Sequence, residues 1–404
     1  MSKHTNTATD TSIHIQFTPL DTWFFREARP HGSVGNSELG SVFPPPVRTL
    51  LGAVRTLMGD AWFAHHGSAE HKDWRSLATN QALQALIGLG DDLGPLRVSG
   101  PFLQRNGQRL YPAPANLMVK EQDGKAHYFL LDLGAPVHCD LGRVHLPCFP
   151  QNVPGLKETV GSKPAEKHWL TQQGYTAVLA GIAPQDKDVL AGKDLWTEEE
   201  RLGIGRDNRR ASVQEGLLYQ TRHLRLQQDI SVEIELHGVC DPSLLPSHTV
   251  VRLGGEGRSA CVQITPGKAS AKLPHAALSE KVRTIALYAL TPAPCYAGVP
   301  AGIPAGFVRS QHQGYDCWSG QLTGQDLRVL AVACQRPLRE GGWDLVQHQA
   351  RPVHSLLAPG SVLYVQSDTP ISAATLHALT TQADASGRGL MVAGKLPQNT
   401  TFQG

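Results

Sequence analysis

The sequence predicts an α+β fold, because short strands alternate with a few helices in an order that occurs twice along the chain. In the first half, a strand at Ile13–Phe17 precedes a helix at about Pro46–Met58, and further strands, a short helical turn, a glycine-rich loop and a last strand follow. A second set of strands with one helix begins after residue 280. The order β-α-β-β-α-β is that of a ferredoxin-like, or RRM-like, domain. We therefore expect two ferredoxin-like domains with large loop and hairpin insertions.

The first domain is expected over residues 10–266. Residues Ile13–Phe17 and Ile230–Leu236 alternate apolar and polar side chains, which is typical of half-buried strands. Between 47 and 57 the apolar residues have helical spacing, and prolines at 44–46 precede the first turn, so a helix is expected there.

Residues from about 60 to 200 follow neither period, and we expect them to form an insertion in the first domain. Within it, residues 80–88 indicate a short helix and Tyr128–Leu133 a strand. After the insertion, the segment DPSLLP indicates a short helical turn, and residues 253–258 form a glycine-rich loop between two extended segments.

The second domain is expected over residues 280–404, after the linker-like segment PGKASAKLP. A helix is predicted near its end, because Thr369 and Pro370 are typical of a helix start and Gly387 of a helix stop. The expected strands are Val282–Leu290, Leu327–Ala333, Ser361–Gln366 and Gly389–Ala393.

The composition limits the classes of function. With 37 basic and 35 acidic residues the formal charge is only +2, so any contact with nucleic acid has to be a local patch. Seven cysteines, an odd number without a CxxC pair, favour free thiols in a reducing compartment. The sequence shows neither an apolar signal segment nor a membrane span. We expect a cytoplasmic protein with no membrane partner.

Positive charge is concentrated between Arg201 and Leu226, in the segment RLGIGRDNRRASVQEGLLYQTRHLRL. Its arginines are Arg201, Arg206, Arg209, Arg210, Arg222 and Arg225. Within the segment only Asp207 and Glu215 oppose them. A guanidinium group matches phosphate oxygens in pairs and can stack on bases, and the glycines at 203 and 205 would let a ligand approach the backbone. The same pattern is also typical of a solvated charged loop that leads into a strand.

Two further patches could contact an anion. The loop LGGEGR would offer accessible amide groups and one cation, at Gly254, Gly255, Gly257 and Arg258. Arg48 and Arg55 are seven positions apart, so both lie on one face of the first helix. A glycine-rich hairpin and ordinary solvation of a helix face explain the same residues without a ligand. Their placement on one RRM-like frame favours RNA.

Aromatic and imidazole side chains are the remaining candidates for RNA contact or chemistry. Tyr219, Trp23 and Phe24 could stack on bases, although core positions explain them better. His31 lies in a glycine-rich loop and His223 lies among arginines, whose positive charge would lower its pKa. Without paired carboxylates near them in the sequence, both histidines are expected to be structural.

Signatures of common enzymes are missing from the sequence. The chain has no P-loop, complete dinucleotide fingerprint, GxSxG or HExxH motif. His138, Cys139, His145 and Cys148 have intervals that could hold zinc, but an irregular loop with incidental histidines and cysteines explains them as well. We expect no catalytic residue, no metal ion and no other cofactor.

The order and spacing of several blocks resemble a known family. These blocks are DTWFFREARPHG, FPPPVRTLLGAVRT, VSGPFL with YPAPANL, LGIGRDNRRASVQEGLLY, VVRLGGEGR, and GGWDL with RPVHSLLAPGSVLYV. Over residues 13–366 the chain is similar to the third subunit of the Cmr complex, a RAMP-superfamily protein of type III-B CRISPR–Cas effectors. Residues 385–404 depart from the pattern, because SGRGLMVAGKL is a reduced version of the glycine-containing ending of that family.

The resemblance implies a non-catalytic subunit that binds the repeat-derived 5′ handle of the CRISPR RNA. It also implies docking to the large polymerase/cyclase-like subunit and to the backbone RAMP subunits, with target RNA contacted only indirectly. RNA binding would fall to the segment from Arg206 to Tyr219, to Arg55 and to the glycine-rich loop. Two alternatives stay open: a metal-independent RAMP endoribonuclease that cuts repeat RNA with a histidine, and a scaffold whose arginines meet acidic protein surfaces.

Overall fold

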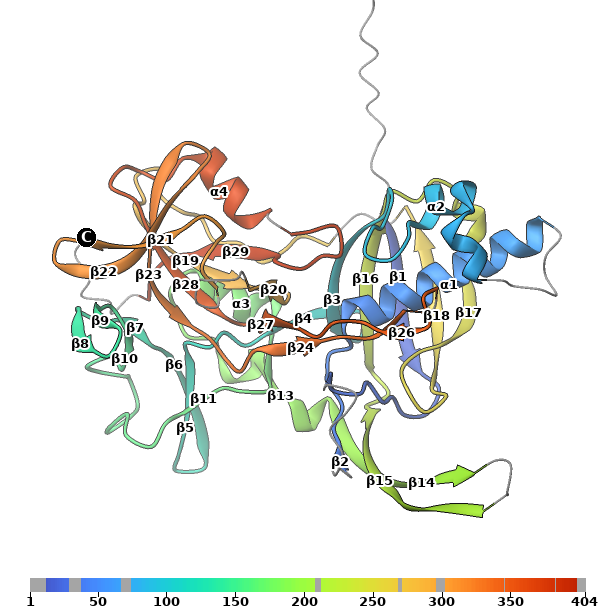
Figure 1. Ribbon diagram of the computed structural model, residues 1–404. Coiled ribbons are helices and arrows are strands. Elements are labelled where there is room, and N and C mark those ends of the chain that lie inside the picture. The colour runs from blue at the N-terminus through green and yellow to red at the C-terminus, as the bar shows by residue number, and fades with distance from the viewer. Residues whose placement is uncertain are drawn as a thin grey trace, which may run out of the picture.

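The computed structural model describes residues 12–28, 38–66, 74–207, 212–267, 271–295, 302–344, 346–381 and 383–397, with the backbone alone for 205–207 and 212–217. The fold is α+β, as predicted, and consists mainly of antiparallel strands with four α-helices in these residues. Two large sheets dominate the molecule, one of eight strands and one of six. In Figure 1 the first lies to the right and the second to the left.

The eight-stranded sheet contains the first strand of the chain near its middle. β1 (Ile13–Pro19) has two antiparallel neighbours, and Ile15 lies opposite Ile234 on one side and Ile264 on the other. In spatial order the strands are β13 (Val189–Ala191), β12 (His168–Thr171), β4 (Gln108–Pro112), β3 (Arg97–Arg105), β16 (Ile230–His237), β1, β18 (Ser259–Pro266) and β17 (His248–Arg252). The strands predicted at 13–17 and 230–236 are confirmed.

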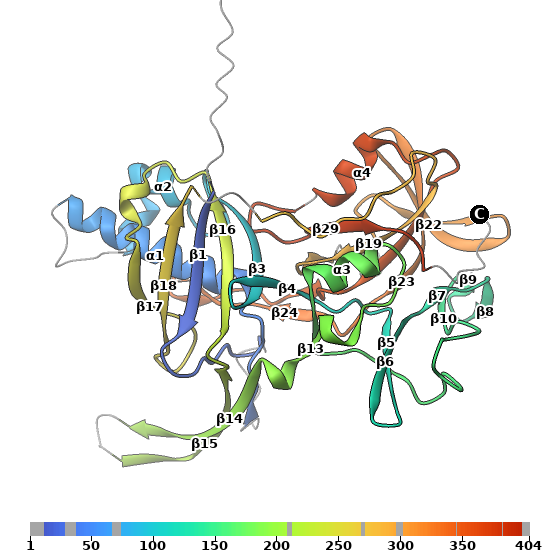
Figure 2. The ribbon, with the colours of Figure 1, turned by 180° about the vertical axis from the view of Figure 1, so that it is seen from behind.

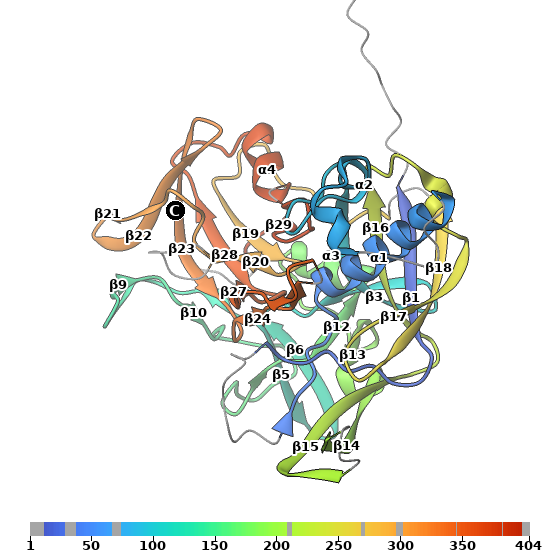
Figure 3. The same cartoon turned by 45° about the vertical axis from the view of Figure 1, so that its right-hand side comes forward.

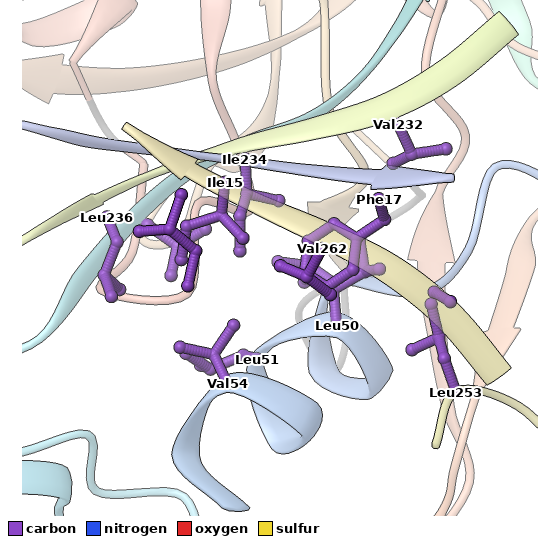
Figure 4. Packing of buried hydrophobic residues seen from close by; sticks show 14 of the residues in the cluster. Ile15, Phe17, Leu50, Leu51, Val54, Val232, Ile234, Leu236, Leu253 and Val262 are labelled. Atoms are coloured by element: carbon purple, nitrogen blue, oxygen red, sulfur yellow. The ribbon is translucent and has the colours of Figure 1, made fainter. Parts of the chain in front are cut away.

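Helix α1 (Val47–His65) covers one face of this sheet (Figure 3). Leu50 and Val54 point from the helix toward the strands, where they meet Ile15 and Val262 in a single buried cluster (Figure 4). Each aliphatic side chain buried in this way contributes about 1.5–3 kcal/mol to folding. The helix and the sheet therefore hold each other in place.

The first helix is longer than its sequence pattern predicted. It begins after Pro46, as expected, but it ends at His65 rather than at Met58. Phe63 is buried in the same cluster and Trp62 packs against that cluster. The additional turns therefore bury apolar side chains beyond Met58, where the predicted helix ended.

Short helical segments border the face that α1 covers. α2 (Gln81–Ile87) begins after Asn80, whose side chain accepts a hydrogen bond from the amide of Leu83. The 3-10 turn η4 (Pro242–Leu244) begins after Asp241 in the same way. Both confirm the sequence predictions for 80–88 and for DPSLLP. A further 3-10 turn, η1, spans Trp74–Ala78.

The six-stranded sheet is built from the second half of the chain. Its strands in spatial order are β21 (Val308–His312), β22 (Tyr315–Leu322), β23 (Gln325–Ala333), β28 (Val362–Gln366), β19 (Thr284–Ala289) and β29 (Met391–Gly394). Tyr288 lies opposite Val362 of β28 and Val392 of β29, so β19 is a central strand. The four strands predicted after residue 280 are all present, with bounds shifted by a few residues.

Helix α4 (Ala373–Thr380) is shorter than the sequence indicated. Its cap is Ser372, whose hydroxyl accepts a hydrogen bond from the amide of Thr375, and not Thr369. The helix also ends at Thr380, well before Gly387, and Asp384 then folds residues 384–388 into a separate turn through hydrogen bonds to backbone amides. The helix therefore begins at the Ser372 cap and not at Thr369 and Pro370, and Gly387 belongs to the turn that follows the helix and does not mark its end.

Much of the 60–200 region packs against the second sheet. α3 (Gln172–Leu179) lies against β29, and the amide of Lys395 donates to the carbonyl of Leu179 at 2.8 Å. Buried tyrosines from both halves of the chain share one core, namely Tyr111, Tyr175, Tyr288 and Tyr364. The two large sheets are therefore joined through a common apolar layer.

The predicted strand at Tyr128–Leu133 is divided in two. β6 (Lys125–Leu130) pairs with β5 (Leu117–Gln122), which also pairs with β11 (Lys163–Pro164), and β7 (Asp132–Leu133) pairs with β10 (Pro147–Cys148). The smaller sheets are β8 (Val137–Cys139) with β9 (Gly142–Val144), β20 (Ala293–Pro294) with β27 (His354–Leu357) and β24 (Leu338–Glu340), and β25 (Trp343–Asp344) with β26 (Gln349–Ala350). Two 3-10 turns, η2 (Asp186–Asp188) and η3 (Gly192–Asp194), flank β13.

The arginine-rich segment belongs to a long β-hairpin rather than to the solvated charged loop that its sequence also allowed. β14 (Trp196–Asp207) and β15 (Ser212–Leu226) pair antiparallel, and β2 (Glu38–Leu39) adds a short parallel strand to β15. The hairpin projects away from the first sheet, as Figure 2 shows at its lower left. Glycines at 203 and 205 masked the apolar-polar alternation that marks a strand.

Two predictions from composition can be compared with the structure. All seven cysteines lie in the described residues and are free, as expected. Among the helices of the described ranges, none is both long and apolar enough to cross a membrane.

Candidate nucleic-acid interface

The base of the β14–β15 hairpin is anchored to the first sheet by one aspartate. Asp21, in the turn after β1, accepts hydrogen bonds from Arg201 of β14 at 3.1 Å and from Arg225 of β15 at 2.9 Å. Arg258, which follows the glycine-rich loop, donates to the same carboxylate at 3.2 Å. Three segments that are distant in the sequence therefore meet at a single anion.

A second carboxylate completes this group. Glu199 of β14 accepts hydrogen bonds from Arg201 at 2.6 Å and from Arg225 at 2.7 Å. Hydrogen bonds from the two guanidinium groups lower the pKa of Glu199, and those from Arg201 and then Arg225 lower the pKa of Asp21. We refer to Asp21, Glu199, Arg201, Arg225 and Arg258 as the Asp21 cluster; its formal charge is one positive unit.

The arginines of the hairpin are therefore less available than the sequence suggested. Besides the two in the Asp21 cluster, Arg222 forms an ion pair with Glu38 of β2. The opposing carboxylates come from Asp21, Glu38 and Glu199, all outside the segment from 201 to 226. Asp207 and Glu215 are the only acidic residues within the segment, but in the folded chain these three carboxylates also neutralise its arginines.

The other arginines of the segment are Arg206, Arg209 and Arg210. Arg206 pairs with Val213 through the backbone at the end of the two strands, and its side chain lies outside the described residues. Arg209 and Arg210 come between β14 and β15 in the sequence and lie outside the described residues entirely. They stay predicted RNA-binding residues.

The glycine-rich loop is a turn in which several backbone amides are already hydrogen-bonded within the protein. The amide of Leu253 donates to the carbonyl of Arg258, and the amide of Arg258 donates to the carbonyl of Gly255. The amide of Gly255 donates to the carbonyl of Phe24 at 2.7 Å. The expectation that the amides of this loop are generally accessible is wrong for these three groups, because they hold the turn together and attach it to the body of the protein.

Packing against Phe24 also explains two of the three glycines. A Cβ atom on Gly254 would lie 2.6 Å from the carbonyl oxygen of Phe24, and one on Gly255 would lie 3.0 Å from its ring. Gly257 has a positive φ of 67° with open space around it. The glycines let the turn approach the buried segment, and the turn then places Arg258 beside Asp21.

Tyr219 connects the hairpin to this turn. Its ring lies over Gly203, the residue opposite it on β14, where a Cβ atom would be 2.3 Å from the ring. Its hydroxyl donates to Glu256 of the glycine-rich loop at 3.5 Å. Trp23 and Phe24 are buried, as the sequence favoured, so only Tyr219 of these three aromatics is partly exposed and could stack on a base.

His223 is a core residue with 1% exposure. Its ring stacks on Phe24 at 5.2 Å, and its Nδ1 lies 3.1 Å from the hydroxyl of Thr22. Burial first, and then the charges of Arg258 and Arg201, lower the pKa of His223 to about 4. The predicted direction of this shift is confirmed, and the imidazole is neutral at pH 7. His31 lies outside the described residues.

Arg48 and Arg55 belong to a different part of the surface. Arg48 and Arg351 both donate to Asp91 at 2.8 Å, and Arg55 donates to the carbonyl of Gly90 at 3.0 Å. Burial is the main cause that lowers the pKa of Arg55, and the charge of Arg351 adds to it. The two arginines do share a helix face, as predicted, but they contact the 90–91 loop and not the Asp21 cluster.

The proposed zinc ligands do not converge. His138 and Cys139 are exposed on β8, whereas His145 is buried with its Nδ1 2.8 Å from the carbonyl of Gly134. Within the described residues, the only group of three with metal-ligating geometry is elsewhere, formed by His14, Glu233 and Glu235.

That buried group already contains its own cation. Arg109 of β4 forms ion pairs with both Glu233 and Glu235, and its guanidinium lies 4.5 Å from the centre of the Phe102 ring. His14 completes the group with its Nδ1 3.0 Å from Glu233. A metal ion does not fit, because Arg109 occupies the carboxylate oxygens that would bind it. Sequence analysis missed this cluster, because glutamates at 233 and 235 in an alternating strand are expected to face solvent, whereas both faces of β16 are buried.

A pocket of about 500 Å³ lies beside the first turn of α1. Its apolar lining includes Phe43, Leu103 and Leu338, and Arg336 and Arg339 are exposed at its border. Sequence reasoning gave no indication of it, because its walls come from segments more than three hundred residues apart.

The comparison with known sequences defines the class of protein. Residues 15–396 match the family described as CRISPR-associated protein (Cas_Cmr3), and the chain belongs to that family. Within this class it is a subunit of the type III-B Cmr effector complex, as the sequence blocks indicated. No curated protein sequence matches the chain.

Solved structures of type III effectors are similar to this chain at low identity. One is the type III-B Cmr-beta complex bound to cognate target RNA and AMPPnP, in state 1, with 14% identity, a TM-score of 0.46, and 87% of this chain and 86% of that chain covered. A second is the same complex bound to cognate target RNA, with 15% identity, a TM-score of 0.44 and the same coverage. A third is a Csm3–Csm4 subcomplex of a type III-A complex, with 9% identity, a TM-score of 0.35, and 89% and 93% covered.

Proposed function

We propose that this subunit binds the 5′ handle of the CRISPR RNA and docks to the large polymerase/cyclase-like subunit and to the backbone subunits. The observation that carries the proposal is the convergence at Asp21 of arginines from β14, β15 and the glycine-rich turn. This arrangement fixes a cationic hairpin next to a partly exposed tyrosine. Single-stranded RNA is bound by such combinations of phosphate contacts and stacking surfaces.

The proposal divides the arginines into two groups with different tasks. Arg201 and Arg225 hold the base of the hairpin through Asp21 and Glu199, so a phosphate would have to displace a carboxylate to reach them. Phosphate contacts therefore fall to Arg206, Arg209 and Arg210. Arg258 also donates to Asp21, so a phosphate would have to displace that carboxylate to reach it as well. Arg48 and Arg55 would form a separate contact, either with the guide or with a neighbouring subunit.

Strand order supports two ferredoxin-like domains at 10–266 and 280–404. In the first large sheet the central order is β3-β16-β1-β18, and in the second it is β23-β28-β19-β29. Numbered within each half, both are 2-3-1-4, which is the strand order of a βαββαβ unit. In the second unit α4 supplies the helix between the last two strands. We propose this pair of domains as the frame of the subunit.

We also propose that the subunit is not a nuclease. A histidine that cuts RNA has to reach the substrate and to exchange a proton near neutral pH. His223 is buried and its pKa of about 4 keeps it neutral, which argues against that role. Incubation of the purified protein with repeat RNA in EDTA tests the alternative. Cleavage that disappears on His31→Ala or His223→Ala would establish the nuclease instead.

Charge reversal at the hairpin turn tests the binding proposal. The variant Arg206→Glu, Arg209→Glu, Arg210→Glu should reduce the guide RNA retained by the assembled effector, and each lost phosphate contact should reduce the salt slope by about 0.7. Reversal of three exposed arginines elsewhere, Arg97, Arg283 and Arg336, is the matched control. Equal retention by both variants at moderate salt would refute the proposal and favour a scaffold that binds acidic protein surfaces.

A further inference from the structure

The two faces of the β14–β15 hairpin differ in chemistry. In the register of the hairpin, Ile204 lies opposite Leu218 and Leu202 lies opposite Gln220. Side chains alternate between the faces of a strand, so these four residues share one face. Gly203 and Tyr219, which lie opposite each other, are on the other face. The face with Gly203 is turned toward the glycine-rich loop, and the face with Leu202 is turned away from it.

Three large apolar side chains on the outer face are exposed. Leu202 is 74% exposed, Ile204 55% and Leu218 59%. They form one stripe, because Ile204 and Leu218 are directly opposite and Leu202 is two positions along the same strand. A stripe of this kind on a projecting two-stranded ribbon is typical of an interaction site, since such a ribbon has no second layer to cover it.

Charges bordering the stripe indicate the chemistry of the partner. Toward the hairpin base, the same face carries Glu198, Glu200 and Arg222. Arg222 forms an ion pair with Glu38 and lies 3.8 Å from Glu198 and 3.9 Å from Glu200. Three carboxylates thus surround one guanidinium, which leaves an excess of two negative charges. Such a border repels phosphates and attracts lysine and arginine.

We propose that Leu202, Ile204 and Leu218 form the docking surface for a neighbouring protein subunit, whose apolar patch is bordered by basic residues. The inference rests on the proposed function, in that the chain works inside a multisubunit effector. β14 lies at the edge of its three-stranded sheet in the described residues, so its outer side is open to a neighbour. The hairpin then contacts RNA through its turn and protein through its outer face.

A photoreactive side chain at position 202 tests the partner directly. Leu202 is replaced by p-benzoylphenylalanine in the complex assembled from all subunits and guide RNA, and Thr197, exposed at the hairpin base on the opposite face, carries the same group as a control. The expected result is an adduct with another protein subunit from position 202 that is absent from position 197. Adducts with RNA alone, or no adduct from position 202, overturn the inference.

Removal of the apolar stripe tests its contribution. In the variant Leu202→Ser with Leu218→Ser, association of this chain with the other subunits should weaken by roughly tenfold or more. Because both side chains are exposed, the melting temperature of the isolated chain should not change. Unchanged association overturns the inference, whatever the guide RNA does. Loss of guide RNA in the turn-arginine variant, with assembly intact, reports on the proposed RNA contact separately.

Discussion

Asp21 and Arg225 lie 204 positions apart in the sequence, yet their side chains form a hydrogen bond at 2.9 Å. This contact joins the end of β1 to the base of the long hairpin. Arg201 and Arg258 donate to the same carboxylate, so one acidic side chain orients three guanidinium groups. The orientation of the hairpin relative to the first sheet therefore depends on a residue far from the arginine-rich segment.

Replacing Asp21 with asparagine should test whether the anchored hairpin is needed for RNA binding. The variant loses the anionic acceptor of three arginines but keeps a side chain of similar shape. Because these groups are partly exposed, the loss in unfolding free energy should stay below about 1 kcal/mol. Guide RNA retention should fall, because the base of the hairpin loses the anion that orients it. Filter binding of the assembled complex measures retention, and unchanged or increased retention would show that Asp21 does not position the hairpin for the guide.

Acidification should weaken the same contacts. The pKa values of Asp21 and Glu199 are lowered in the folded protein from ordinary values of 3.8 and 4.5. A carboxylate with a lowered pKa stabilises the fold above its unfolded pKa, and this contribution is lost as the pH falls through the folded pKa. The rate of proteolysis of the hairpin should therefore increase only below about pH 4. In the variant Asp21→Asn with Glu199→Gln, the rate should not show this increase.

His223 should make stability depend on pH in a higher range. Its folded pKa of about 4 is below the ordinary value of 6.5, so the unfolded chain binds a proton first as the pH falls. Between pH 6.5 and 4 this difference lowers the unfolding free energy, by up to about 3 kcal/mol. Urea unfolding at pH 7 and pH 5 should show a smaller difference for His223→Gln than for the unaltered protein. Equal differences would mean that the pKa of His223 does not change on unfolding.

The glycines of the 253–258 turn should differ in their sensitivity to alanine. Gly254→Ala places a Cβ atom 2.6 Å from the carbonyl of Phe24 at a positive φ of 91°, so it should cost about 2 kcal/mol or more. Gly257→Ala has the positive φ without the clash and should cost only about 1 kcal/mol. Thermal unfolding compares the two. Equal effects would contradict the packing role assigned to Gly254.

Local strands and helices could be predicted from the sequence, but the ion-pair partners of Arg201, Arg222 and Arg225 could not. Alternation located β1 and β16, and helical spacing located α1, because these periods reflect burial on a single face. The ion pairs of these arginines with Asp21 and Glu38 were not predictable, since the partners are 180 to 204 positions apart in the sequence. Local composition reports the charge of a segment, whereas folding decides how much of that charge is neutralised.

The buried group around Arg109 should be the most sensitive ionic site of the first sheet. Arg109→Met leaves Glu233 and Glu235 without their shared cation at 3% exposure, which typically costs about 3–5 kcal/mol. Glu233→Gln in the same chain should recover part of that loss, because one uncompensated charge is removed. Chemical denaturation of the single and double variants measures both effects. If Arg109→Met had no effect on stability, the ion pairs of Arg109 with Glu233 and Glu235 would not stabilise the first sheet.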